Sequence, residues 1–105
     1  MGTGIENIPA NYLDYYIEAN REQTVIVDVG KRSRFEKRHI KGAINIPYDE
    51  MVKENYDLPH NKIIILYCDR GGTSMMAAKY LLSHGYEVKN VVGGLRSYRG
   101  KNIVE

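Results

Sequence analysis

The residues best suited to chemistry are a single cysteine, Cys68, and the glycine-containing segment that follows it. Gly71 and Gly72 permit backbone conformations in which successive N–H groups converge on one point and bind an anion. Converging amides and a helix N-terminus can lower the pKa of a cysteine thiol from about 8.5 and make it a nucleophile. We therefore expect Cys68 to be a nucleophile and the amides to stabilise negative charge on its sulfur.

Each residue after the cysteine has an expected part in binding. The N–H groups of residues 69–74 would form the anion cradle, and Thr73 or Ser74 would add a hydroxyl hydrogen bond and cap the next helix. Arg70 either orients an anionic donor or lies exposed in the loop. An inward carboxylate would disfavour a thiolate, so Asp69 is expected to point outward. The candidate substrate-binding residues are Asp69, Arg70, Gly71, Gly72, Thr73 and Ser74.

The hydrophobic pattern predicts the strands that position this segment. Residues 63–67 form an uninterrupted apolar run, typical of a strand buried on both faces, and Cys68 stands at its carboxyl end. Ligands of open α/β sheets bind beyond the carboxyl ends of the strands, so the cysteine lies where a site is expected. A lone cysteine there can alternatively pack as a small hydrophobic residue. Further strands are expected at 25–29, 43–46, 88–92 and, at an edge, 5–8.

Helical patterns separate these strands. Pro9 would begin a helix over residues 9–20, which has apolar residues at helical spacing. Ser33 and Glu36 form a capping box that predicts a short helix ending at residue 38. An apolar stripe followed by a glycine predicts a helix over residues 74–84. Strands that alternate with helices favour an α/β fold with right-handed parallel crossovers.

Composition favours one small domain over residues 1–105. The chain is 43% hydrophobic and 27% charged, and its length suits a single core. One cysteine cannot form an internal disulfide, and we find neither a signal-like leader nor a membrane span, so a cytoplasmic protein is expected. The three histidines show no metal-ligand spacing and no nucleotide fingerprint is present, which predicts no metal and no cofactor.

Charge is uneven along the chain. The net charge is +2, yet residues 31–41 hold six basic residues and one acidic residue. Such a run can attract anions or an acidic partner, but a solvated helix face is the interpretation that we favour. No aromatic-interleaved basic motif is present, so no nucleic-acid partner is expected.

Several motifs together resemble the rhodanese-like family. They are Val25–Val29 (VIVDV), His39–Pro47 (HIKGAINIP), the Tyr67–Cys68 pair with its glycine loop, and the Gly93–Gly94 pair. The resemblance implies a rhodanese-like α/β fold with a central parallel sheet of about five strands flanked by helices on both faces. It also implies an active cysteine, here Cys68, that carries sulfur as a persulfide.

The sequence departs from the family pattern at three places. Thr73 stands where the family loop commonly has arginine, so anion binding is expected to differ. Gly30 replaces the arginine that usually follows the Asp-Val strand, with Lys31 and Arg32 adjacent as substitutes, and Tyr98 replaces a tryptophan. A phosphatase loop would end in arginine at position 74, which is serine here.

Two hypotheses of function follow. In the first, a sulfurtransferase moves sulfane sulfur from a donor such as thiosulfate, through a persulfide on Cys68, to cyanide, a small thiol or a partner protein. In the second, the domain is non-catalytic and serves docking or regulation, which the missing loop arginine and Asp69 favour. Asp28 and His39 are expected to be structural, held by hydrogen bonds to the backbone.

Overall fold

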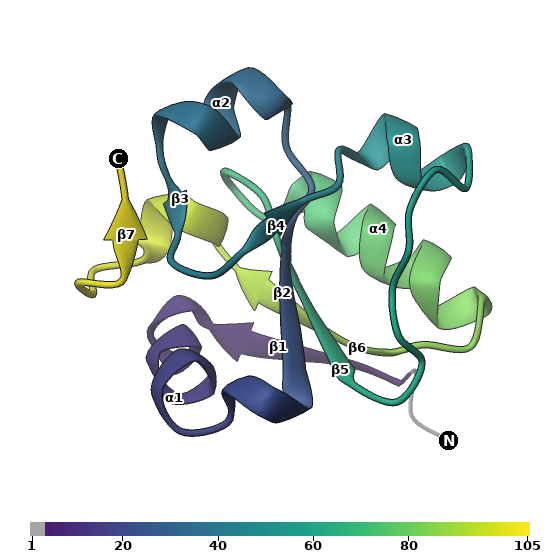
Figure 1. Ribbon diagram of the computed structural model, residues 1–105, viewed down its shortest axis with the longest axis horizontal. Coiled ribbons are helices and arrows are strands. Elements are labelled where there is room, and N and C mark those ends of the chain that lie inside the picture. The colour runs from purple at the N-terminus through teal and green to yellow at the C-terminus, as the bar shows by residue number, and fades with distance from the viewer. Residues whose placement is uncertain (1–3) are drawn as a thin grey trace.

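The structure, a computed structural model, describes residues 4–105, so residues 1–3 of the expected domain lie outside the described part. Five parallel strands form one sheet in the order β1-β6-β5-β2-β4 (Figure 1). Their bounds are β1 Ile5–Pro9, β2 Thr24–Asp28, β4 Ile44–Asn45, β5 Ile63–Tyr67 and β6 Glu87–Val92. The helices are α1 Leu13–Glu18, α2 Arg32–Lys37, α3 Tyr48–Val52 and α4 Gly72–Ser83, with 3-10 turns η1 Ala10–Tyr12, η2 Arg21–Gln23 and η3 Gly94–Ser97.

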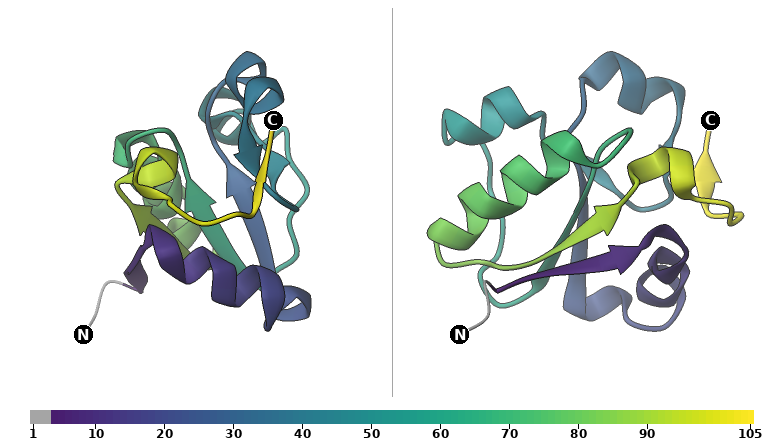
Figure 2. Two further views of the ribbon diagram at one scale, coloured as in Figure 1. Left: turned by 90° about the vertical axis from the view of Figure 1, so that its left-hand side faces the viewer. Right: turned by 180° about the vertical axis from the view of Figure 1, so that it is seen from behind.

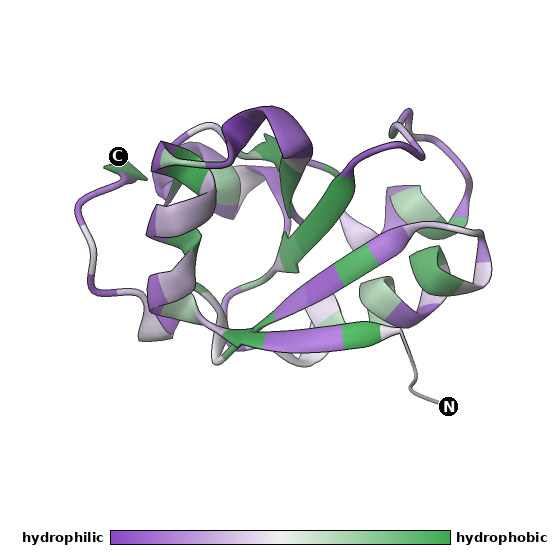
Figure 3. Cartoon of the chain, turned by 90° about the horizontal axis from the view of Figure 1, so that it is seen from below, coloured by the Kyte–Doolittle hydropathy of each residue, from purple (hydrophilic) through white to green (hydrophobic). Residues whose placement is uncertain are grey.

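Burial explains the contrast between the central and the edge strands. The apolar side chains of β5 are enclosed on both faces, and residues 64 to 67 have no exposed surface. Along the edge strand β1 and its neighbour β6, by contrast, hydrophilic and hydrophobic residues are mixed (Figure 3). The strand predicted from the uninterrupted apolar run at 63–67 is confirmed as β5. The edge strand predicted at 5–8 is confirmed as β1.

Two hydrophobic cores lie on opposite faces of the sheet. α3 and α4 cover one face, where Met51, Ala78 and Leu81 are buried. α1 and η3 cover the other, where Leu13 and Leu95 are buried. Figure 2 shows α4 and α1 on opposite sides of the strands. The prediction of a parallel α/β sheet with helices on both faces is therefore confirmed.

Three details of the predicted helices are wrong. The segment predicted as a helix over 9–20 divides into η1 and α1, and Pro9 ends β1 instead of starting the helix. Ser33 is not a cap, because α2 already begins at Arg32 and no side chain caps it. α4 begins at Gly72, so neither Thr73 nor Ser74 can be its N-cap.

The structure adds short elements that the sequence did not reveal. α3 has five residues, and a small antiparallel sheet pairs β3 (His39–Ile40) with β7 (Ile103–Val104). Elements of two to five residues are too short to display a hydrophobic period. In the described part of the chain, no helix has the length and apolar character that a bilayer span requires.

Candidate active site

Cys68 lies immediately after β5, at the carboxyl end of the sheet. A cleft of about 740 Å³ opens there between α2 and the loop that joins β5 to α4. In Figure 1 both segments lie beyond the carboxyl ends of β2 and β5. The cleft is lined by Asp28, Gly30, Lys31, Arg34, Lys37, Arg38, Cys68, Asp69, Arg70, Gly72, Thr73 and Leu95. Four of the six predicted substrate-binding residues, Asp69, Arg70, Gly72 and Thr73, line this cleft, whereas Gly71 and Ser74 do not.

The loop directs two backbone amides at the sulfur. Gly71 N donates to Cys68 Sγ at 3.0 Å and Ser74 N donates at 3.4 Å. Gly71 has φ of 112°, a left-handed conformation that suits glycine, and it places the start of α4 over the sulfur. The predicted cradle of six amides is narrower than expected, because within residues 4–105 only these two backbone N–H groups donate to Sγ. Cys68 is 6% exposed, so a shielded sulfur meets hydrogen-bond donors at the base of an open cleft.

A buried polar chain continues from the sulfur toward the edge strand. The Cys68 thiol donates to Ser74 Oγ at 3.6 Å, and the Ser74 hydroxyl donates to Asn90 Oδ1 at 2.6 Å and approaches the Gly71 carbonyl oxygen at 3.1 Å. Asn90 Nδ2 then donates to Asn7 Oδ1 at 3.1 Å. Ser74 has no exposed surface and Asn90 only 3%. The predicted hydroxyl contact of Ser74 is therefore present.

The segment that begins with the Gly93–Gly94 pair forms hydrogen bonds to the cysteine loop. Leu95 N donates to the Cys68 carbonyl at 2.8 Å, and Arg96 N donates to the Asp69 carbonyl at 3.1 Å. Gly94 has φ of 64°, and a Cβ there would lie 2.4 Å from the Cys68 carbonyl oxygen. The close approach of the two backbones thus requires glycine at position 94. Residue-level reasoning missed Gly94 and Asn90, although the Gly93–Gly94 pair was a signal for the first.

Asp28 and Tyr67 form a second buried polar group beside the cleft. They are neighbours in the register of β2 and β5. The Asp28 carboxylate accepts from Gly30 N at 2.8 Å and from the Tyr67 hydroxyl, which itself accepts from Ile40 N at 3.0 Å. Burial raises the pKa of Asp28, and it raises the pKa of Tyr67 together with the adjacent Asp28 charge. The expected backbone hydrogen bond of Asp28 is confirmed.

His39 has a similar structural environment. Its Nδ1 lies 2.6 Å from the Phe35 carbonyl oxygen, and its ring stacks on Phe35 with the centroids 3.8 Å apart. The imidazole therefore links β3 to a backbone carbonyl of α2, a helix rather than the loop backbone that was expected. In residues 4–105 no three histidine, cysteine or acidic side chains gather closely enough to hold a metal ion.

Charged side chains surround the mouth of the cleft. Asp69 pairs with Arg34 of α2 at 3.2 Å and with Arg70 at 3.8 Å, and these side chains are 37%, 65% and 77% exposed. Asp69 is thus partly outward-facing, but it also lines the cleft. The basic run is exposed, as predicted, yet its members Lys31, Arg34, Lys37 and Arg38 also line the cleft. Arg32 instead lines a different hollow.

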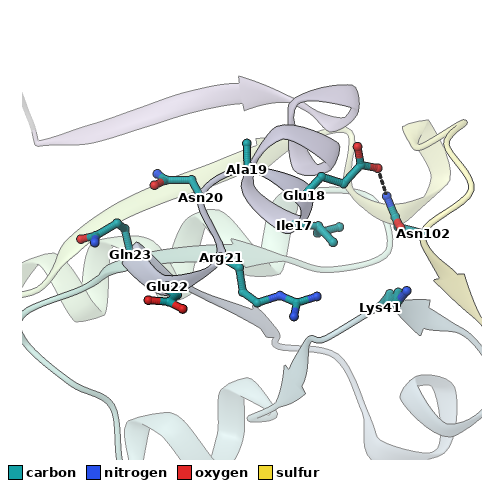
Figure 4. Close-up of a pocket in the computed structure, with 9 residues that line it drawn as sticks. All are labelled: Ile17, Glu18, Ala19, Asn20, Arg21, Glu22, Gln23, Lys41 and Asn102. Atoms are coloured by element: carbon teal, nitrogen blue, oxygen red, sulfur yellow. Dashed lines mark hydrogen bonds between the residues drawn. The ribbon is translucent and has the colours of Figure 1, made fainter.

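A second hollow, of about 650 Å³, lies near η2, which leads into the amino end of β2 (Figure 4). Its lining contains both acidic residues, Glu18 and Glu22, and basic residues, Arg21 and Lys41. Glu18 accepts a hydrogen bond from Asn102 at 3.0 Å. Its lining includes neither a thiol nor an imidazole, so the chemistry-bearing residues gather at the Cys68 cleft.

The fold and the site define a class: a doubly wound α/β protein with a buried cysteine in a loop of inward-facing amides. The model of the rhodanese-like domain matches residues 10–101, and the chain belongs to this family. The crystal structure of SSP1007 from Staphylococcus saprophyticus superposes with a TM-score of 0.82 at 28% identity, over 95% of this chain and 99% of that one.

Two relatives carry names that refer to sulfur. "Putative sulfur carrier protein YrkF" of Bacillus subtilis is 38% identical over 81 residues, which are 76% of this chain and 44% of that protein. A tRNA sulfurtransferase of Desulfurococcus amylolyticus is 34% identical over 76 residues, which are 72% of this chain and 15% of that protein. The chain thus spans less than half the length of either relative. Sulfur transfer is the chemistry that both names share.

Proposed function

We propose that the protein is a rhodanese-type sulfurtransferase that carries sulfane sulfur as a persulfide on Cys68. The observation that carries this proposal is the pair of amides, Gly71 N and Ser74 N, that donate to Sγ at 3.0 and 3.4 Å. They lie at the start of a twelve-residue helix, whose dipole also favours negative charge there. The open cleft beyond the sulfur leaves room for a donor to approach.

The chemistry proceeds in two displacements. With thiosulfate, the Cys68 thiolate attacks the outer sulfur, a new S–S bond forms, the sulfur–sulfur bond of thiosulfate breaks, and sulfite leaves with the electron pair. The cysteine persulfide anion remains. In the second step a thiolate or cyanide attacks the terminal sulfur, takes it as a persulfide or thiocyanate, and regenerates the Cys68 thiolate. No external oxidant or reductant is needed.

The acceptor must come from another molecule. Cys68 is the only cysteine in the sequence, so no second thiol of this chain can resolve the persulfide. We infer that the acceptor is cyanide, a small thiol or a partner protein, and that the cycle runs in the reducing cytoplasm, where thiols are abundant. The sulfur-related names of the relatives support this assignment.

Intact-protein mass spectrometry tests the proposal. The purified chain is incubated with thiosulfate or with a small-molecule persulfide, and the mass gain of one sulfur atom is measured. Cys68→Ser should show no gain, and cyanide should remove the gain from the wild type with release of thiocyanate. A wild type that never gains sulfur from any of these donors overturns the proposal.

A non-catalytic docking domain is the second candidate, favoured by Thr73 at the usual arginine position and by the carboxylate of Asp69 beside Cys68. The rate of iodoacetamide alkylation at pH 6 separates the two. A sulfurtransferase cysteine should react faster than a small free thiol at this pH. Equal rates, together with failure to load sulfur, would favour docking.

A further inference from the structure

The loop after Cys68 lacks the arginine that is common in the family, so another cation must bind an anionic donor. Thr73 occupies that place and its side chain lines the cleft without a hydrogen bond to any residue of the described chain. Cations nonetheless line the cleft, four from the 31–38 segment and one, Arg70, from the loop itself. Most of the positive charge of the cleft thus comes from the 31–38 segment rather than from the cysteine loop.

Asp69 occupies the position between these two sources of charge. Its carboxylate lies 3.2 Å from Arg34 Nη2 and 3.8 Å from Arg70 Nε. It stands directly after the nucleophile in the sequence, and its carbonyl is fixed by Arg96 N at 3.1 Å. A fixed backbone therefore presents a carboxylate to the two arginines that a donor anion would otherwise meet.

We propose, on the basis of the proposed function, that Arg34 replaces the missing loop arginine as the anion-binding residue, and that Asp69 is a specificity-determining residue that competes with small anionic donors for it. An exposed ion pair of this kind is weak and salt-sensitive, so a ligand with enough charge can displace Asp69. Thiosulfate has one compact anionic group and must compete with the carboxylate directly.

The rest of the cleft indicates which donors compete best. Lys31 and Lys37 line it and have no acidic partner within residues 4–105, whereas Arg38 pairs with Glu105 at 3.6 Å. The volume of about 740 Å³ is in the range of small-molecule sites and far exceeds what thiosulfate fills. The preferred donor is therefore a low-molecular-weight persulfide with two or more separated anionic groups, which reach Lys31 or Lys37 as well as Arg34.

Three donors distinguish this inference from the general function: thiosulfate, the persulfide of mercaptosuccinate with two carboxylates, and the persulfide of 2-mercaptoethanol, which has no carboxylate. The second-order rate of sulfur loading on Cys68 is measured at low and high salt by mass spectrometry. Asp69→Asn should raise the rate with thiosulfate by about three- to tenfold at low salt, because two arginines lose their internal partner. The gain should shrink at high salt, and it should be smallest with the persulfide that has no carboxylate.

The partner variants complete the test. Arg34→Gln should lower loading from both anionic donors severalfold, and the gain from Asp69→Asn should largely disappear in the double variant, because the two residues act on one anion. Arg32→Gln, on the same helix but outside the cleft, and Asp57→Asn, an exposed acid elsewhere, make the same charge changes and should match the wild type.

The outcomes separate the two proposals. If wild type loads sulfur but Asp69→Asn and Arg34→Gln behave like their controls, the roles of Asp69 and Arg34 are overturned and the sulfurtransferase remains. A wild type that prefers thiosulfate to the mercaptosuccinate persulfide overturns the donor class. Failure of every variant with every donor overturns both proposals.

Discussion

The two halves of the cleft are built on different principles. The floor, which consists of Cys68, Ser74 and Asn90, is buried and has hydrogen bonds of 2.6 to 3.6 Å along its length. The rim, which consists of Arg34, Asp69 and Arg70, has partly or fully exposed side chains that are linked to one another by ion pairs. Buried polar groups are costly to disturb, whereas exposed ion pairs contribute little to stability. Floor substitutions should therefore change folding and chemistry together, and rim substitutions should change ligand choice alone.

The largest effect on stability is expected at Gly94, where the backbone packs against the Cys68 carbonyl. Gly94→Ala places a Cβ 2.4 Å from the Cys68 carbonyl oxygen at a left-handed φ of 64°. We expect a loss of about 3 kcal/mol or more in the free energy of unfolding, together with slower sulfur loading, because the loop must shift. Urea denaturation and mass spectrometry provide the two readouts.

Gly42→Ala is the matched control for Gly94→Ala. Gly42 also has a left-handed φ, of 84°, but a Cβ there meets nothing within 4 Å. It should lose only about 1–2 kcal/mol, which is the conformational term without the clash. Equal losses for the two variants would show that Gly94 does not act through its approach to the cysteine loop.

A smaller but still clear effect is expected at Asn90. Asn90→Ala removes the acceptor of the buried Ser74 hydroxyl, which should lower the free energy of unfolding by about 1–3 kcal/mol. It should also change the pH dependence of Cys68 alkylation, since the same hydroxyl contacts Sγ. Asn7→Ala, at the exposed end of the chain of hydrogen bonds, should have much less effect on either measurement. A pH profile that stays unchanged in Asn90→Ala would mean that the floor does not influence the sulfur.

Asp28, which also lines the cleft, should make the free energy of unfolding depend on pH. Burial raises the pKa of Asp28 from 3.8, so the folded protein holds this proton more tightly than the unfolded chain. The resulting stability is fully present below about pH 3.8 and is lost as the pH rises through the folded pKa. Each unit of the rise corresponds to about 1.4 kcal/mol. Denaturation from pH 4 to 7 should therefore show Asp28→Asn gaining stability relative to wild type as the pH increases. A constant difference would contradict this.

The smallest effect on folding is expected at the rim. Arg34→Gln breaks an ion pair whose side chains are 65% and 37% exposed, so the free energy of unfolding should change by less than about 1 kcal/mol. Urea denaturation beside Arg32→Gln measures it. A loss comparable to that of Asn90→Ala would remove the distinction between floor and rim.

The same contrast explains what the sequence could predict. β5 and the residues after Cys68 are contiguous, and an uninterrupted apolar run followed by two glycines can be interpreted without the fold. Asn90, Gly94 and Arg34 lie 20 or more positions from Cys68, and only the sheet order and the crossover of β6 bring them to the loop. Their individual residue types do not indicate these contacts.

The errors in the helices have a local cause. Ser33 and Glu36 satisfy the spacing of a capping box, but the N-cap of α2 is Lys31, two residues earlier, whose backbone is extended. Thr73 and Ser74 were expected to cap α4, yet Gly71 adopts the left-handed conformation and the helix begins before either side chain can serve. A shift of two or three residues at a helix start is decided by backbone geometry rather than by the type of one side chain.

The hydrogen bonds from Leu95 and Arg96 to the cysteine loop have a consequence for biosynthesis. The carbonyls of Cys68 and Asp69 receive their partners from a segment made 26 or more residues later, so a nascent chain that has reached only Ser74 lacks the support of its loop. Contacts between distant segments also form late in folding. The thiol thus acquires its finished surroundings only after β6 and η3 have been synthesised and docked, which delays its reactivity until nearly all of the domain has been assembled.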